Sequence, residues 1–195
     1  MRDFVKKLVE GVFLIISLPF FIVFKLLTLL SNKDKTFSTF SQLLSLFPGY
    51  FGCQLRLGFF KLTMTDCQKS VVISFSTLFS QADTELHQGV YIGPQCNIGK
   101  CKIEANCLVG SGVHIMSGKG QHNFSDLNTP LKDQGGVFNK VTIGEDSWIG
   151  NGALILANIG KKCVVAAGSV VVNDVPDFAI VAGNPAKIIK MRNSS

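Results

Sequence analysis

The sequence predicts a mainly β chain, a solenoid of short strands with a six-residue period, preceded by hydrophobic and amphipathic helices. Two observations predict this. Aliphatic residues recur at every sixth position from about residue 86, a period that fits neither a helix nor an alternating strand. Phe and Leu concentrate before residue 65, so the 47% apolar content of the 195 residues is unevenly spread. We therefore expect a membrane-associated helical segment at 1–65 and a β-domain at 66–195.

The helical segment opens with an uncharged apolar run at 11–24, which resumes after Lys25. A spanning helix needs about 20 apolar residues, so 8–30 is long enough to cross a bilayer. Three interpretations compete: a cleavable signal peptide, a single span, and a re-entrant or interfacial helix kinked at Pro19. The sequence shows no small-residue cleavage site, and basic residues flank both ends of the run. We favour the third interpretation, because it leaves both basic flanks in the cytoplasm.

Two amphipathic pieces follow. Apolar residues repeat at helical steps over 37–47, and Pro48 with Gly49 ends that helix. The next piece, 55–62, mixes apolar residues with two basic ones. Such pieces lie either in the lipid headgroup layer or as a cap on the end of the β-domain, and the sequence leaves both open.

The repeat of the β-domain has three parts: an aliphatic residue, in many repeats a glycine directly after it, and a small residue four positions after it. The aliphatic positions are Leu86, Ile92, Ile98, Ile103, Val109, Ile115, Ile143, Ile149, Ile155, Ile159, Val165 and Val171. The small residues include Cys96, Cys107, Val113, Ser147, Ala153, Cys163 and Ser169. This register predicts stacked coils with the aliphatic side chain inside and glycine at a tight corner. Phase slips at 98–103 and 155–159 predict trimmed turns.

The C-terminal strings IGEDSWIGNGALIL, VVAAGSVV and DVPDFAIVAGNPAKII resemble the hexapeptide-repeat acyltransferases, the family of galactoside, maltose, serine and xenobiotic O-acetyltransferases. Gly-Asn-Pro-Ala at 183–186 is a specific tail marker of that family. The resemblance covers 71–192. It implies a left-handed parallel β-helix, a homotrimer with active sites between subunits, and acetyl-CoA as co-substrate.

The repeat is interrupted by a polar, glycine-rich insertion at 117–140, and insertions in solenoids often form the binding face. Acyl transfer to a hydroxyl needs a base, and histidine suits this role because its ordinary pKa lies near 6.5. Relatives place a histidine at the start of such a loop, and His122 is the matching position. Read without the family, His122 is more simply a solvent-exposed loop residue. His114, on a regular strand, is the rival base, and we expect His87 to be structural or exposed.

Other candidate site residues follow from the loop and the resemblance. Residues expected to orient the base or bind the acceptor are Gln121, Asp126, Asn97 and His114. The resemblance places the pantetheine arm of the coenzyme near Asn151, Ala167 and Gly168, and its phosphates near Lys187, Lys190 and Arg192. The last three fit a merely solubilising or membrane-attracting basic tail as well. Val172-Asn173 stands where several relatives have Thr-Lys, so a phosphate contact expected there is missing or comes from elsewhere.

Charge and cysteine content narrow the partners. The net charge of +6 fits anionic lipid or a phosphorylated co-substrate, and the sequence shows no basic run or module typical of nucleic-acid binding. The six cysteines show no C-x-x-C spacing, so we expect reduced thiols and no metal site.

These observations favour an O-acetyltransferase that acts on a sugar hydroxyl of a membrane-bound or lipid-linked glycan, in exopolysaccharide or surface polysaccharide biosynthesis. Its partners would be acetyl-CoA, the glycan acceptor and membrane lipid through 1–65. Its place would be the cytoplasmic face of the cell membrane, the inner membrane of a bacterium. Two alternatives stay open: a trimeric zinc enzyme built on His87, His114 and His122, and a non-catalytic assembly module of a glycan-synthesis complex.

Overall fold

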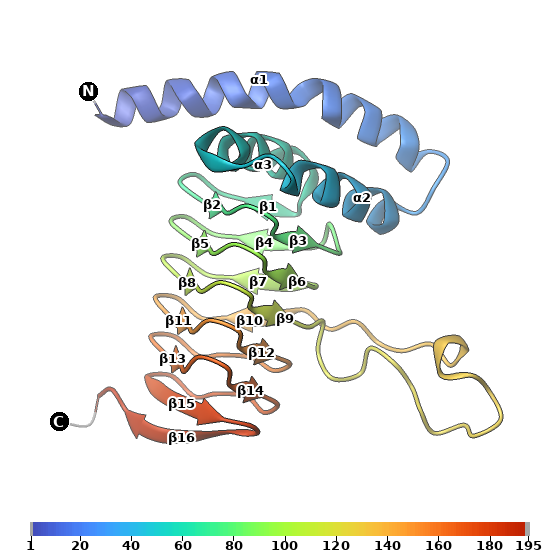
Figure 1. Cartoon of the computed structure of the whole chain (residues 1–195), viewed down its shortest axis with the longest axis vertical. Helices are drawn as coiled ribbons and strands as arrows, with labels where there is room; N and C mark the ends of the chain where they lie inside the picture. Colours follow the sequence, from blue (N-terminus) through green and yellow to red (C-terminus); the bar gives the residue numbers. More distant parts are fainter. Residues whose placement is uncertain (1, 194–195) are drawn as a thin grey trace.

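A computed structural model describes residues 2–193 and shows helices at one end of a stack of short parallel strands (Figure 1). The helices are α1 (Arg2–Thr28), α2 (Lys33–Ser45) and α3 (Gly49–Thr63), and a short 3-10 helix, η1 (Leu131–Asp133), lies in the insertion. Helix gives way to strand between Thr63 and Asp66.

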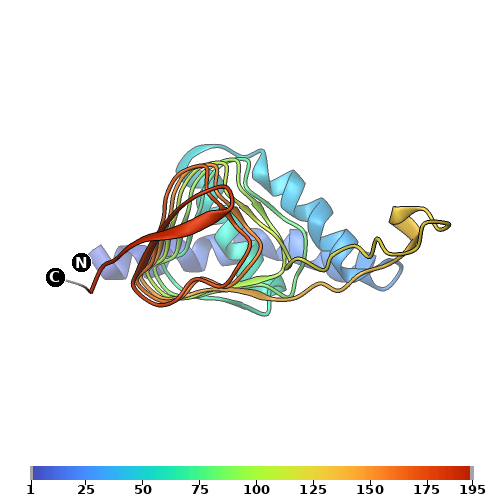
Figure 2. The same cartoon turned by 90° about the horizontal axis from the view of Figure 1, so that it is seen from below.

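The strands form three sheets that are the three sides of a prism (Figure 2). The first sheet contains β1 (Asp66–Cys67), β4 (Glu85–Leu86), β7 (Cys101–Ile103) and β10 (Val141–Ile143). The second contains β2 (Val72–Ile73), β5 (Tyr91–Ile92), β8 (Leu108–Val109), β11 (Trp148–Ile149), β13 (Val164–Val165), β15 (Ala179–Gly183) and the antiparallel β16 (Ala186–Met191). The third contains β3 (Leu78–Phe79), β6 (Asn97–Ile98), β9 (His114–Ile115), β12 (Leu154–Ile155) and β14 (Val170–Val171).

The predicted hexad register is confirmed. Equivalent aliphatic residues stack in adjacent coils, as Ile92 does on Val109 and Val109 on Ile149. All twelve predicted aliphatic positions are buried, and so are the seven small ones. The solenoid core is therefore a column of aliphatic side chains with small residues at its corners. Both phase slips coincide with shortened corners, and at the second Ile159 still forms parallel bridges to Ile143 and Val175.

The glycine of the hexad has a different role from the one we expected. A Cβ added at Gly150 would lie 2.5 Å from the backbone nitrogen of Ala167 in the next coil. The residue is therefore small because stacked backbones approach closely there. The left-handed turn falls two positions later, at Gly152, with φ +67°.

The solenoid begins one coil earlier than the aliphatic repeat indicated. Cys67, Ile73 and Phe79 point inward from β1, β2 and β3, and their backbones pair with the second coil. The sequence hides this coil because a thiol and an aromatic ring occupy aliphatic positions and Ser replaces the hexad glycine after Ile73 and Phe79.

Helices α2 and α3 cap the first coil, so of the two interpretations of these pieces the cap is confirmed. Phe37 and Phe60 continue the core upward, and the ring of Phe60 lies 5.0 Å from that of Phe79. Ser41 Oγ accepts a hydrogen bond from the backbone N–H of Phe79, at 2.8 Å. The helices close the apolar end of the prism, which would otherwise face solvent.

Helix α1 lies across the cap and continues through Pro19, with an axis that bends along its length, and its expected re-entrant or interfacial placement stays a prediction (Figure 1). It packs on α3, where Ser17 Oγ donates to the carbonyl oxygen of Leu55 at 3.3 Å. A Cβ added at Gly58 would lie 2.5 Å from Ser17 Oγ, so the two helices cross very closely. The stretch Phe4–Thr28 is long and apolar enough to cross a membrane, and most of it is not buried in the protein.

Candidate active site

The insertion at 117–140 leaves the solenoid between β9 and β10 and projects far from it as a long loop (Figures 1 and 2). Its two arms are held together by backbone hydrogen bonds. The N–H of Asn139 donates to the carbonyl of Ser117 at 2.9 Å, and the N–H of Val137 donates to that of Gly120 at 2.7 Å. The loop therefore has a fixed neck and presents its outer part to solvent.

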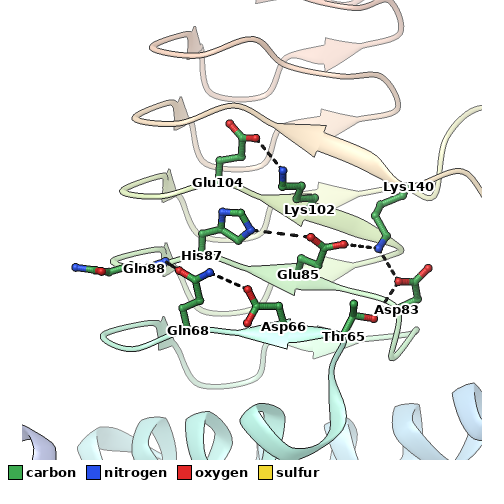
Figure 3. A network of polar contacts seen from close by, with 10 residues as sticks. All are labelled: Thr65, Asp66, Gln68, Asp83, Glu85, His87, Gln88, Lys102, Glu104 and Lys140. Atoms are coloured by element: carbon green, nitrogen blue, oxygen red, sulfur yellow. Dashed lines mark hydrogen bonds and ion pairs between the residues drawn. The ribbon is translucent and has the colours of Figure 1, made fainter.

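A cluster of charges on the first sheet fixes the end of the loop (Figure 3). The Nζ of Lys140 lies 2.5 Å from Oδ1 of Asp83 and 2.7 Å from Oε1 of Glu85. The Nζ of Lys100 adds a second contact to Asp83, at 2.9 Å. Hydrogen bonds from Lys140 and Lys100 hold the pKa of the Asp83 carboxyl well below its usual value. Burial lowers the pKa of Lys140, but its bonds to Asp83 and Glu85 outweigh this and the pKa is raised. Both ions therefore stay charged at neutral pH.

His122 lies on the outer part of the loop, next to Gln121, and is exposed. No hydrogen bond or ion pair joins its imidazole to another residue in the described part of the chain. Asp126 does not contact it. The two oxygens of Asp126 accept from the N–H of Asn128 at 2.8 Å and from Oγ1 of Thr129 at 2.6 Å, and these bonds lower its pKa. The imidazole is free to meet a molecule from outside the chain.

Three of the predicted orienting residues come together in one groove of about 300 Å³ on the third sheet, called here the histidine groove. Asn97 and His114 stand on adjacent strands in register, and Gln121 reaches the groove from the loop. Phe138, which the sequence did not single out, adds an apolar wall. His122 is not among its lining residues.

Two predicted coenzyme positions come together in a second groove of about 400 Å³, called here the corner groove. Asn151 and Ala167 line it where the second sheet turns into the third, and Gly168 is the next residue. The N–H of Gly168 donates to the carbonyl of Asn151, while the N–H of Ala167 has no partner among residues 2–193. Trp148 lines the same groove with half its surface exposed; it lies within the string IGEDSWIGNGALIL but was not among the predicted coenzyme positions.

Lys187 and Lys190 of the basic tail lie on β16, at the edge of the second sheet, and Arg192 directly follows that strand. Lys187 and Lys190 are exposed. One nitrogen of the Arg192 guanidinium is already hydrogen-bonded, since its Nη1 donates to the carbonyl of Lys162 at 2.7 Å. Val172-Asn173 stands where several relatives have Thr-Lys. There, Nζ of Lys119, from the neck of the loop, lies 3.3 Å from Oδ1 of Asn173. A cation therefore reaches this place from another segment, which no local sequence signal indicated.

The cysteines are free, and five of them are buried in the core. Burial raises the pKa of the thiols of Cys67 and Cys101 to about 12 and that of Cys107 to about 11. A buried thiol with a raised pKa is a poor nucleophile, since the thiolate is the reactive form. Residues 2–193 contain no group of three or more His, Cys, Asp or Glu placed to hold a metal ion.

The histidines occupy separate places. His87 lies on the face of the first sheet with its Nε2 4.0 Å from Oε2 of Glu85 (Figure 3). His114 is on the third sheet and His122 is on the loop.

Comparison with known proteins gives no matching family model. The chain is 41% identical over 76 residues to a Mycobacterium tuberculosis protein described as a probable acetyltransferase, covering 38% of this chain and 25% of that one. It is 33% identical over 124 residues to a Lysinibacillus sphaericus protein described as a probable macrolide acetyltransferase, covering 55% and 66%. The chain thus spans from a quarter to about two thirds of the length of these relatives.

Among solved structures, a galactoside acetyltransferase in complex with coenzyme A superimposes with a TM-score of 0.68 at 18% identity, covering 84% of each chain. This likeness shows the fold, a left-handed parallel β-helix. The hexad register, the tail hairpin and these sequence relatives all indicate the same family. The chain belongs to the hexapeptide-repeat acyltransferases.

Proposed function

We propose that this chain transfers an acetyl group from acetyl-CoA to a hydroxyl of a sugar in a membrane-bound or lipid-linked glycan. The observation that carries the proposal is the partner-free, exposed imidazole of His122 on a loop of a solenoid whose relatives are named acetyltransferases. The name of the galactoside acetyltransferase supports a sugar as acceptor. The exposed apolar surface of α1 supports an acceptor at a membrane, because a soluble acceptor needs no such surface.

The corner groove fits the coenzyme. Its walls of Trp148, Val164 and Ala167 suit the apolar parts of a pantetheine arm. The unpartnered N–H of Ala167 offers a hydrogen bond to one of the amide carbonyls of that arm. Lys187 and Lys190 on the neighbouring hairpin are free to bind phosphates.

In the proposed reaction His122 takes the proton of the acceptor hydroxyl as its oxygen attacks the thioester carbonyl. The new C–O bond forms, the C–S bond breaks, and the coenzyme leaves as a thiolate that takes up the proton from the imidazolium. A covalent acyl-enzyme is not needed, and the buried cysteines are unsuited to form one.

The active enzyme is a homotrimer in this proposal. In one chain, His122 lies on a loop that leaves the edge of the third sheet next to the first sheet, while the corner groove lies at its other edge. A second copy would bring the loop of one chain to the corner groove of another. We place the trimer on the cytoplasmic face of a bacterial inner membrane, where acetyl-CoA is available.

Turnover by the purified full chain tests the proposal, with free thiol released from acetyl-CoA as the signal. His122→Ala should lower kcat about 10²–10⁴-fold, while acetyl-CoA binding stays near wild type. His114→Ala is the matched control and should cost much less. If His114→Ala abolished turnover and His122→Ala did not, the two roles would be exchanged. A chain that binds no acetyl-CoA would instead be an assembly module.

The acceptor needs its own test. Mass spectrometry of surface glycans from cells with and without the protein should reveal a missing acetyl group in its absence. Unchanged glycan acetylation would contradict a glycan acceptor.

A further inference from the structure

A positively charged pocket lies at the N-terminal half of α1, remote from both grooves described above. It has a volume of about 350 Å³ and is called here the basic pocket. Its lining residues are Lys6, Lys7, Glu10, Lys69, Ser70 and Gln88. A second hollow of about 200 Å³ shares Lys6, Glu10 and Ser70 with it and extends along α3 past Tyr50 and Gln54. Helix α1, helix α3 and the first coil therefore meet around two adjacent hollows.

The charge of the basic pocket is uncompensated. Its one carboxylate, Glu10, already pairs with Nζ of Lys61 at 2.6 Å and accepts the N–H of Ser70 at 3.3 Å. None of Lys6, Lys7 and Lys69 pairs with a carboxylate among the side chains that the structure describes. Three such ammonium groups around a pocket attract a phosphate group.

A second observation points to a ligand at the same place. Oε1 of Gln54, in the adjoining hollow, is buried and has no hydrogen-bond partner among the residues that the structure describes. A buried acceptor without a donor costs free energy, and a hydroxyl-bearing ligand would supply the missing bond.

The apolar surface next to the basic pocket favours a lipid as the ligand. Residues of α1 that face away from α3 are apolar and exposed, and none is charged between Leu8 and Val23. They are Leu8, Val12, Ile15, Ile16, Leu18, Ile22 and Val23. A helix that is apolar on this outward face as well as on the packed one is typical of a membrane environment.

The packing of α1 decides how it meets the bilayer. It lies across the end of the solenoid, roughly perpendicular to the stack of coils (Figure 1). If α1 crossed the bilayer while packed on α3, the cap and the first coil, with Lys61 and Asp66, would enter the hydrocarbon, where charges are costly. Helix α1 therefore lies in the plane of one leaflet.

We propose that the basic pocket binds the phosphate of an anionic lipid headgroup while the outward face of α1 lies in the same leaflet. This site orients the solenoid with its coils stacked away from the membrane and the capped end against it. The inference rests on the proposed membrane location but not on the proposed chemistry.

Flotation of the full chain with lipid vesicles tests the site. Vesicles of phosphatidylcholine alone are compared with vesicles that also contain phosphatidylglycerol, and we expect tighter binding to the second. The triple variant Lys6→Gln, Lys7→Gln, Lys69→Gln should lose about a hundredfold in affinity for the anionic vesicles, at about fivefold per lysine. Its affinity for neutral vesicles should stay near wild type.

The control is the triple variant Lys132→Gln, Lys161→Gln, Lys162→Gln, which removes the same charge from the loop and the far coils. It should bind anionic vesicles nearly as well as wild type. Equal losses in both triple variants, or equal wild-type binding to both kinds of vesicle, would overturn the site. Thiol release from acetyl-CoA in detergent is measured in parallel, so a failed headgroup site and a failed acetyltransferase are told apart.

Discussion

Arg56 is a buried guanidinium with no carboxylate partner in the described chain. Its Nε donates to the carbonyl of Ile73 at 2.9 Å, and its Nη1 donates to those of Leu44 and Phe47 at 2.9 and 2.8 Å. Burial lowers its pKa, although the neighbouring Cys53 opposes this. One side chain thus donates to backbone carbonyls at the end of α2 and in the first coil, and of these the carbonyl of Leu44 also accepts the N–H of Phe47 at 3.4 Å.

Replacing Arg56 by Met should therefore loosen the cap. The three carbonyls lose the hydrogen bonds from Arg56, and we expect the free energy of unfolding to fall by about 2–4 kcal/mol. For a chain of this size the corresponding fall in Tm is about 5–15 °C. Thermal unfolding followed by circular dichroism measures it, with Lys35→Met on the exposed face of α2 as control. A Tm within a degree or two of wild type would show that the bonds add little.

Trp148 is exposed in the corner groove and should contact the coenzyme. Trp148→Ala should raise KM for acetyl-CoA about tenfold and leave kcat nearly unchanged, because an aromatic wall contributes to binding more than to the reaction. Leu108→Ala is a matched control, since Leu108 pairs with Trp148 in the preceding coil and is also exposed. Equal effects of the two changes would mean that the coenzyme does not lie along the groove.

Neighbouring site residues could be predicted from the sequence on the coils but not on the loop. Asn151 with Ala167, and Asn97 with His114, do share grooves, because a fixed period places residues of adjacent coils side by side. Asp126 was expected to orient the base, yet the structure engages it in its own turn. Loop residues have no period, so their neighbours depend on turn geometry that pattern cannot give.

The insertion depends on the charge cluster of the first sheet. In the folded chain the pKa of Asp83 is lowered, first by its bond to Lys140. A lowered folded pKa contributes stability above the ordinary value near 4, and this stability is lost as pH falls below it. Asp83 is nearly half exposed, so its contribution at neutral pH is about 1 kcal/mol or less.

Asp83→Asn should consequently lower the free energy of unfolding at pH 7 by up to about 1 kcal/mol. The difference from wild type should shrink as pH falls below about 4, because the unfolded chain then takes up a proton at Asp83 that the folded chain binds only at lower pH. Urea unfolding at several pH values measures this. Asp133→Asn, in η1 of the loop, is the control, because Asp133 has no ion pair among the described residues, and it should leave the free energy of unfolding near wild type. A difference for Asp83→Asn that persists at low pH would rule out the ion pairs as its cause.

Helices and strands could be predicted where buried positions recur at a fixed spacing in the sequence. The hexad strands and α2 were recognised because buried positions recur at a fixed step. Helix α1 continues through Pro19, although a proline in a helix interior removes a backbone hydrogen bond and favours a kink. Contacts on both sides of Pro19 hold the helix on the cap, with Ser17 bound to α3 and Phe24 packed on Phe59. Such tertiary contacts cannot be predicted from the local sequence.

The apolar face of α1, the pockets and the insertion lie at different heights along the solenoid. The capped end carries the apolar face of α1 and the basic pocket, and the coils near the tail carry the corner groove. The insertion leaves from the middle of the stack (Figure 1). If the capped end lies on the membrane, the loop and its histidine are held a few coils away from the lipid surface, where a lipid-linked glycan can reach them.

Two large apolar side chains on the loop support the proposal that a further copy covers it. Phe124 is 77% and Leu127 96% exposed in the single chain, on a loop that projects away from its own solenoid. Apolar groups on such a loop lower the free energy once another protein surface removes them from water. In the proposed homotrimer the neighbouring solenoid would supply that surface, and the same contact would carry His122 toward the neighbour's corner groove.

The full chain in detergent should accordingly have a protein mass three times the 21.1 kDa of one chain, as measured by light scattering with the detergent contribution subtracted. The double variant Phe124→Ser, Leu127→Ser should dissociate at higher protein concentration than wild type and lose turnover in proportion, because the site needs two copies. The control Leu8→Ser, Ile15→Ser removes two apolar side chains that detergent covers, and it should remain a trimer. A wild-type chain that is monomeric and still turns over acetyl-CoA would contradict a shared site, since one chain alone would then bring its base to its own coenzyme groove.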